Sequence, residues 1–117
     1  MERGNAALRS GDGQVYYNGV MMERDELLAK LRALKPELKR RYKVREFGIF
    51  GSWARGEQRK GSDLDILVDF EEDADLFDWI GLTLYLEEVL GVSVDVVPRK
   101  ALRRELQSRV LRQVIEV

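Results

Sequence analysis

The sequence predicts a small α/β domain of the α+β kind, in which a small β-sheet is flanked by helices on one face. Three observations predict this fold class. Leucines recur at helical spacing between residues 27 and 38, two short runs rich in β-branched and aromatic residues follow at 44–50 and 64–70, and a longer apolar segment spans 76–90. A chain of 117 residues can bury one such core.

The first helix is predicted from leucines that share one face. Leu27, Leu31, Leu34 and Leu38 are separated by four, three and four positions. Pro36 falls inside this pattern. Because proline lacks the amide hydrogen and clashes with the preceding turn, we expect it to end or kink the helix near Leu34 and to begin a second short helix.

Two strands and a second long helix are predicted in the middle of the chain. The runs 44–50 and 64–70 read as strands, and a polar segment that starts at Gly51 joins them. Acidic residues at 71–75 are expected to form a turn. The segment 76–90 is apolar on most sides and is followed by a glycine, which favours a helix with a glycine C-cap.

The C-terminal part is predicted to add one strand and one helix. Residues 93–97 form a short β-branched run that stops at a proline. Apolar residues then recur every four positions from 102 to 114, which predicts a helix with a basic outer face. At the other end, residues 1–20 contain several glycines and little periodicity. We expect them to be a poorly ordered arm, and residues 21–117 to be the domain.

Composition restricts the possible chemistry. The chain has no cysteine and no histidine, so a metal site would have to be built from oxygen ligands, which favour Mg²⁺, Mn²⁺ or Ca²⁺ over zinc. Its 20 basic residues nearly balance 21 acidic ones, which is no direct evidence for binding to nucleic acid or to a membrane surface. No apolar run could cross a bilayer and no signal-peptide pattern is present, so we expect a cytoplasmic protein.

Three aspartates form a candidate metal site. Asp63 and Asp65 are two positions apart at the start of a predicted strand, so their side chains should project from one face. Asp95 lies between two valines in a later strand and should also face away from the core. If the strands are neighbours, the three carboxylates repel one another, and a divalent cation would offset the repulsion. The alternatives are that Asp63 and Asp65 are simply solvated, and that Asp95 lies on an edge strand whose outer face is exposed to water.

A glycine–serine turn follows the first predicted strand in FGSWARG. Gly51 lets the backbone come close to a ligand, and Ser52 is a suitable N-cap for a short helix that begins near Trp53. Backbone amides at such a helix start can bind phosphate oxygens, and Arg55 adds positive charge nearby. The alternative is an ordinary strand-to-helix turn.

Taken together, FGSWARGE, GSDLDILVDF and VSVDVVP resemble the motifs of the minimal nucleotidyltransferases (MNT) of the DNA polymerase β-like superfamily. The resemblance extends from about Leu27 to Val117, nearly the whole domain. It implies a small mixed sheet with the active site on its exposed face. It also implies in-line displacement at the α-phosphorus of ATP or another nucleoside triphosphate, with pyrophosphate as the leaving group.

The resemblance also implies roles for individual residues. The glycine–serine turn at Gly51 would bind the nucleotide phosphates, with Arg55 close by. Asp63, Asp65 and Asp95 would bind one or two Mg²⁺ ions, with Mn²⁺ as another possible cation. The third of these carboxylates would also help to deprotonate the attacking hydroxyl group.

Small stand-alone members of this family resemble the antitoxins of HEPN/MNT toxin–antitoxin pairs. The resemblance therefore implies AMP transfer to a tyrosine of a HEPN-type partner toxin, which silences the toxin. The alternative is a catalytically weak nucleotide-binding module that neutralises a protein partner by direct contact. The presence of all three aspartates favours the enzyme.

Other residues admit two interpretations each. Trp53 could stack on a nucleotide base or pack half-buried, with no preference between the two. Trp79, Leu82 and Leu86 are expected to belong to the core. The basic segment 99–104 is expected to be the outer face of an amphipathic helix rather than a docking site.

Overall fold

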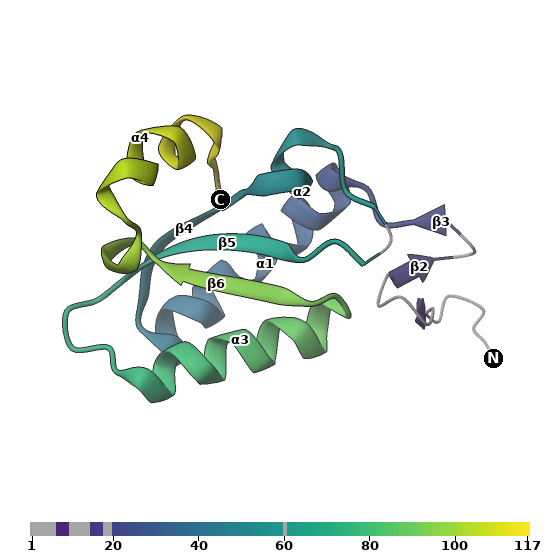
Figure 1. The fold of residues 1–117 in the computed structure, drawn as a ribbon. Helices are drawn as coiled ribbons and strands as arrows, with labels where there is room; N and C mark the ends of the chain where they lie inside the picture. The colour runs from purple at the N-terminus through teal and green to yellow at the C-terminus, as the bar shows by residue number, and fades with distance from the viewer. Residues whose placement is uncertain (1–6, 10–14, 18–19, 60) are drawn as a thin grey trace.

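The computed structural model describes residues 7–9, 15–17, 20–59 and 61–117 (Figure 1). Near the N-terminus, three short antiparallel strands form a small sheet: β1 (Ala7–Arg9), β2 (Val15–Tyr17) and β3 (Val20–Met21). The expectation of a poorly ordered arm at 1–20 falls largely outside the described residues. It stays a prediction, as does the division between this arm and a domain at 21–117.

The rest of the described chain is built around a four-stranded mixed sheet with the order β6-β5-β4-β7 (Figure 1). β5 runs parallel to β6 and antiparallel to β4, and β4 is antiparallel to β7. The predicted mixed sheet is therefore confirmed. Its strands are β4 (Val44–Phe50), β5 (Leu64–Phe70), β6 (Val94–Pro98) and β7 (Ile115–Glu116).

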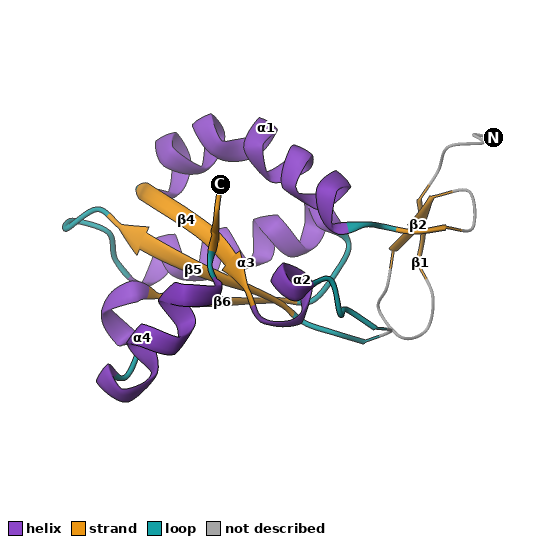
Figure 2. Ribbon diagram, turned by 90° about the horizontal axis from the view of Figure 1, so that it is seen from above, coloured by secondary structure: helices purple, strands orange, loops and turns teal. Residues whose placement is uncertain are grey.

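Two long helices, α1 (Arg24–Tyr42) and α3 (Leu76–Leu90), cover one face of this sheet. Leucines of both helices share one core cluster with the strand residues that face them. The shorter helices are α2 (Gly51–Arg55) and α4 (Arg104–Gln113), and a 3-10 turn, η1 (Arg99–Ala101), precedes α4. Figure 2 shows α1 and α4 on opposite sides of the sheet. The second face is thus covered only in part, which leaves room for a site there.

The prediction that Pro36 ends or kinks the first helix into two is wrong, because α1 is one helix of 19 residues with Pro36 inside it. Leu31 on one side of the proline and Leu38 on the other are both buried in the core. Pro36 itself is exposed, so the hydrogen bond that it cannot donate is lost on the water side of the helix. Burial of leucines on both sides of the proline therefore outweighs the local penalty.

α3 ends before the predicted C-cap Gly91, and its N-terminus has a capping box that was not predicted. Gly91 has a φ of 73° and donates its backbone N–H to Glu87 O. At the other end, Asp75 and Asp78 form a reciprocal capping box, in which each carboxylate accepts the other residue's backbone N–H. Both ends of α3 are therefore well defined.

The C-terminal region differs from its prediction in two ways. The helix is shorter than 102–114, because η1 precedes α4 and β7 follows it. β7 was not predicted, since a strand of two residues exists only through its pairing with β4. Gly48 and Ile49 of β4 are paired with it, and Val117 N donates to Phe47 O at 3.0 Å.

β6 is an edge strand of the sheet, and α3 covers part of its free edge. Trp79 Nε1 donates to Val96 O, and Val94 N donates to Glu87 Oε2, each at 3.0 Å. Such contacts block further strand pairing. The expectation that Trp79 belongs to the core is wrong, because the residue is 38% exposed, whereas Leu82 and Leu86 are buried as predicted. In the described part of the chain, no helix is long and apolar enough to cross a membrane.

Candidate active site

Asp65 and Asp95 are side by side on the outer face of the sheet. They are register partners on the parallel strands β5 and β6. Their neighbours Leu64, Ile66 and Val94 are buried on the opposite face, and the alternation of a strand therefore turns both carboxylates outward. Asp65 is half-buried and Asp95 is exposed. Asp95 therefore lies on an edge strand and faces water, which is the alternative that the sequence left open for this residue.

Asp63 precedes β5 and is exposed. Its charge still reaches Asp65, whose pKa is raised from 3.8 to about 6 by burial first, then by the charges of Asp95 and Asp63. The positive charge of Arg55 opposes this rise in pKa. The three aspartates thus form one cluster of mutually repelling groups around Asp65.

The glycine turn lies directly against this cluster. Gly51 has a φ of 73°, a backbone conformation that favours glycine. A side chain at this position would overlap the Asp65 carboxylate, because its Cβ would fall on Asp65 Oδ2. Glycine at this position is therefore required both by the backbone and by the neighbouring carboxylate.

The predicted N-cap role of Ser52 is wrong. α2 begins at Gly51, its N-cap is Phe50, and no side chain caps it. The chain passes from β4 into α2 without an intervening loop, so the cap position falls on the last strand residue. Ser52 then lies inside the first turn of α2, with its side chain partly exposed.

Arg55 is exposed and connects α2 to the C-terminal helix. Its Nε donates to Glu57 Oε1 at 2.9 Å, and its Nη1 donates to Gln113 Oε1 at 3.2 Å. Gln113 is the last residue of α4. Sequence reasoning did not single out this glutamine, since no local signal indicates that α4 ends beside α2.

Trp53 is fully buried in the core cluster. It cannot offer a ring face to a nucleotide base, and the stacking interpretation is therefore wrong. Its Nε1 is among the buried polar atoms that have no hydrogen-bond partner in the described structure. The neighbouring Ala54 O accepts a hydrogen bond from Arg24 Nη1 at 2.8 Å, which fixes α2 to the start of α1.

The donor set of this cluster suits a hard divalent cation, since it consists of carboxylate oxygens. The raised pKa of Asp65 indicates negative charge that the surrounding protein does not fully compensate, and a bound cation would supply that compensation. As the side chains stand, however, no group of three or more potential ligands among the described residues encloses a metal position.

This fold and site define a nucleotidyltransferase. Residues 31–116 match the family model of the nucleotidyltransferase domain, and the chain belongs to that family. The match spans α3 and all four strands of the main sheet, as well as most of α1. The resemblance that the sequence motifs indicated is therefore confirmed.

Among its relatives is the protein adenylyltransferase MntA of Thermococcus cleftensis. The chain is 46% identical to it over 97 residues, which cover 83% of this chain and 98% of the relative. A Methanocaldococcus jannaschii protein assigned as a protein adenylyltransferase is 43% identical over 84 residues, 72% of this chain and 98% of that protein.

Solved structures share the fold. One assigned as a minimal nucleotidyltransferase has a TM-score of 0.73 and 43% identity, and covers 82% of this chain and 97% of its own. A crystal structure of a toxin–antitoxin with AMP-PNP has a TM-score of 0.59 and 25% identity, and covers 81% of this chain and 72% of its own.

Proposed function

We propose that this chain is a metal-dependent protein adenylyltransferase, which transfers AMP from ATP to a hydroxyl group of a partner protein. The observation that carries the proposal is the pairing of Asp65 with Asp95 on the outer face of the sheet, with the Gly51 turn beside them. Oxygen ligands and a phosphate-binding turn on one face are what transfer of a nucleotidyl group requires.

In this proposal the triphosphate lies against the Gly51–Ser52 turn and the aspartates. Because Gly51 has no side chain, the Asp65 carboxylate lies directly against the turn, and phosphates bound at the turn would be close to the clustered aspartates. Arg55, held by Glu57 and Gln113, adds positive charge near the phosphates. Mg²⁺ would be held by the three clustered aspartates, with Mn²⁺ as an alternative. When bound, the cation would neutralise negative charge on the attacking and leaving oxygens.

The reaction follows from this placement. The acceptor oxygen attacks the α-phosphorus of ATP, a new P–O bond forms, and the bond to the β-phosphate oxygen breaks, so that pyrophosphate leaves. The Asp95 carboxylate takes the proton of the attacking hydroxyl and passes it to solvent. Asp95 suits this role because it is exposed on an edge strand, where a large acceptor can approach.

The proposed acceptor is a tyrosine of a HEPN-type toxin, which would make this chain the antitoxin of a toxin–antitoxin pair. Two findings favour a protein acceptor. A relative at 46% identity is a protein adenylyltransferase, and a toxin–antitoxin with AMP-PNP has a similar fold.

A second candidate is a nucleotide-binding module that neutralises its partner by contact. One observation favours it, namely that the carboxylates do not enclose a metal position as they stand. The two candidates differ in their dependence on the aspartates, since neutralisation by contact does not need them.

The test is transfer of label from ATP, labelled at the α-phosphate, to a HEPN-type toxin, in the presence of Mg²⁺. Asp65→Asn and Asp95→Asn should each lower the rate by at least about a hundredfold. Asp69→Asn is the matched control, because Asp69 lies on the same strand but is paired with Arg45 at 3.7 Å. Neutralisation of the toxin that survives the first two substitutions would favour the binding module instead.

A further inference from the structure

Helix α3 is apolar on two sides. One side is buried against the sheet through Leu82, Leu86 and Leu90. α3 also carries most of the large hydrophobic residues that are exposed in the described part of the chain, and three of them, Leu76, Ile80 and Leu84, form a stripe on its solvent side. A helix that is apolar on both sides is normally covered on both sides. The exposed residues are Leu76, Phe77, Trp79, Ile80, Leu84 and Val89.

The exposed side contains a shallow groove of about 290 Å³. Its lining residues are spaced as one continuous stripe of a helix. The polar groups in this lining are already used, because Trp79 Nε1 donates to Val96 O and Thr83 Oγ1 donates to Trp79 O. The groove therefore offers mainly apolar contact. It is lined by Leu76, Trp79, Ile80, Thr83 and Leu84.

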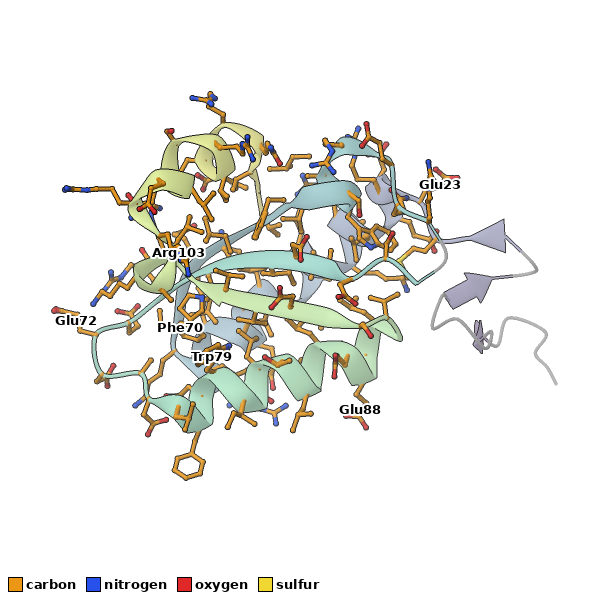
Figure 3. The ribbon with its side chains drawn as sticks, in the orientation of Figure 1. Glu23, Phe70, Glu72, Trp79, Glu88 and Arg103 are labelled. Carbon is orange, nitrogen blue, oxygen red and sulfur yellow. The ribbon has the colours of Figure 1, made fainter. Side chains whose placement is uncertain are left out.

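The helix that carries the groove has acidic residues and no basic ones, whereas Arg99 and Lys100 lie beside Glu72 in the turn that precedes it. No lysine or arginine occurs from residue 61 to residue 98, a stretch that includes the whole of α3. Figure 3 shows Glu72, in the turn before α3, and Glu88, near its C-terminal end, both pointing away from the body of the protein. Glu88 is one helical turn from Leu84 and so flanks the groove. An occupant with positive charge beside its apolar contacts would fit best.

We propose that the outer face of α3 is a docking surface for an amphipathic helix of a partner protein, whose apolar stripe is flanked by lysine or arginine. The proposal rests on the proposed function in one respect, since the partner is taken to be the protein that accepts AMP. An apolar stripe with a fixed indole at its centre is typical of a helix-binding groove.

A second copy of this chain fits the groove less well. Its α4 is basic and exposes Leu106 and Leu111, each at 41%. These leucines are five positions apart, so they do not lie on one stripe of the helix. Leu111 also lines a different hollow, beneath α4. A separate partner helix is therefore a better occupant than α4 of a second copy.

The probe is a synthetic helical peptide of about 18 residues, close to the length of α3. It carries leucines at alternating spacings of three and four, with lysines on both flanks. A control peptide keeps the leucines and replaces the lysines by glutamates. Calorimetric titration into the full chain should show binding of the basic peptide that weakens with salt. The acidic peptide should bind at least about tenfold more weakly.

Three variants test the location of binding. Leu84→Gln, at a residue that is 61% exposed, should weaken binding of the basic peptide about tenfold. Leu106→Gln on α4, at 41% exposure, is the matched control and should leave binding unchanged. Glu88→Lys should weaken binding of the basic peptide and strengthen that of the acidic one. Circular dichroism of each variant checks that the fold is intact.

Several results would overturn the docking surface: no binding of either peptide, equal binding of both, or equal loss in Leu84→Gln and Leu106→Gln. A dimer in light scattering that Leu84→Gln dissociates would assign the groove to a second copy instead. The proposed function is tested separately with Asp65→Asn, which should bind the basic peptide like the parent protein. Wild-type protein that binds the peptide but transfers no AMP would overturn the proposed function alone.

Discussion

The carboxylate of Asp65 lies against the backbone of Gly51, in the space that the first side-chain atom of any other residue would fill. This contact joins the end of β4 to the start of β5, and it brings the turn and the aspartate cluster together. Its consequences can be measured separately from catalysis, because Gly56 at the other end of α2 provides a control.

Gly51→Ala should destabilise the protein more than Gly56→Ala. The two glycines have nearly the same φ, 73° and 72°, so each substitution places alanine at a positive φ, which costs about 1 kcal/mol. Only at position 51 would the new methyl group overlap Asp65, whereas nothing lies within 4 Å at position 56. Overlap adds about 1–3 kcal/mol. Urea unfolding measures both, and equal losses would contradict this reading of the contact.

Asp65→Asn should stabilise the metal-free protein at neutral and higher pH. The pKa of Asp65 is raised from 3.8 to about 6, so the folded state favours the protonated form. The stability that this proton provides is complete below pH about 4 and is lost as the pH rises through about 6. Because Asp65 is only half-buried, we expect a difference of about 1–2 kcal/mol at pH 8.

The measurement is urea unfolding of both proteins from pH 4 to pH 8 in the presence of a chelator. The carboxyl groups of Glu37 and Glu46 have lowered pKa values, through Arg40 and Lys35 respectively, and their contributions change in the opposite direction. Both residues are present in both proteins, so their contributions cancel in the difference. A difference that stays constant with pH would contradict the raised pKa of Asp65.

Addition of Mg²⁺ should raise the thermal midpoint of the protein at pH 8 and have less effect at pH 5, where Asp65 is largely protonated. Saturating cation should add about 1–3 kcal/mol to the free energy of unfolding. Asp65→Asn and Asp95→Asn should lose this stabilisation, and Asp69→Asn should keep it. Differential scanning calorimetry provides the measurement, and an equal gain in all four proteins would indicate cation binding elsewhere.

Pro36→Ala should stabilise α1. Pro36 is exposed and lies inside a helix of 19 residues, where alanine restores one hydrogen bond and removes a clash. We expect a gain of about 1–3 kcal/mol in the free energy of unfolding. Ala33→Gly, at an exposed position one turn away, should instead cost about 1 kcal/mol. A neutral or destabilising Pro36→Ala would show that the helix is adapted to the proline.

Gly48→Ala should loosen the C-terminal strand. The added Cβ would lie 2.6 Å from Val114 Cγ1 and 2.7 Å from Ile115 O, so β7 would have to move. Because Val117 N donates to Phe47 O at 3.0 Å, its amide reports on this movement. Its hydrogen exchange should become about tenfold faster or more, while amides of β5 stay protected. Unchanged exchange at Val117 would contradict close packing at Gly48.

The periodicity and spacing of residues identified most elements of the fold. Leucine spacing located α1, a long apolar segment followed by a glycine located α3, and β-branched runs located β4, β5 and β6 to within about one residue. These patterns are readable because burial on one face repeats along the chain. Pro36 was misinterpreted because its local penalty is visible in the sequence, whereas the burial of Leu31 and Leu38 on either side of it is not.

The sequence by itself determined that Asp63, Asp65 and Asp95 are the candidate ligands, because residue type and strand alternation are local properties. The tertiary structure alone decided that Asp65 and Asp95 are register partners, that Gly51 touches Asp65, and that Gln113 holds Arg55. It also decided that Trp53 is buried while α3 stays apolar on its outer side. The physical reason is that these relationships depend on which strands pair and which helix faces meet, and contacts between residues far apart in the chain leave no periodic signal in it.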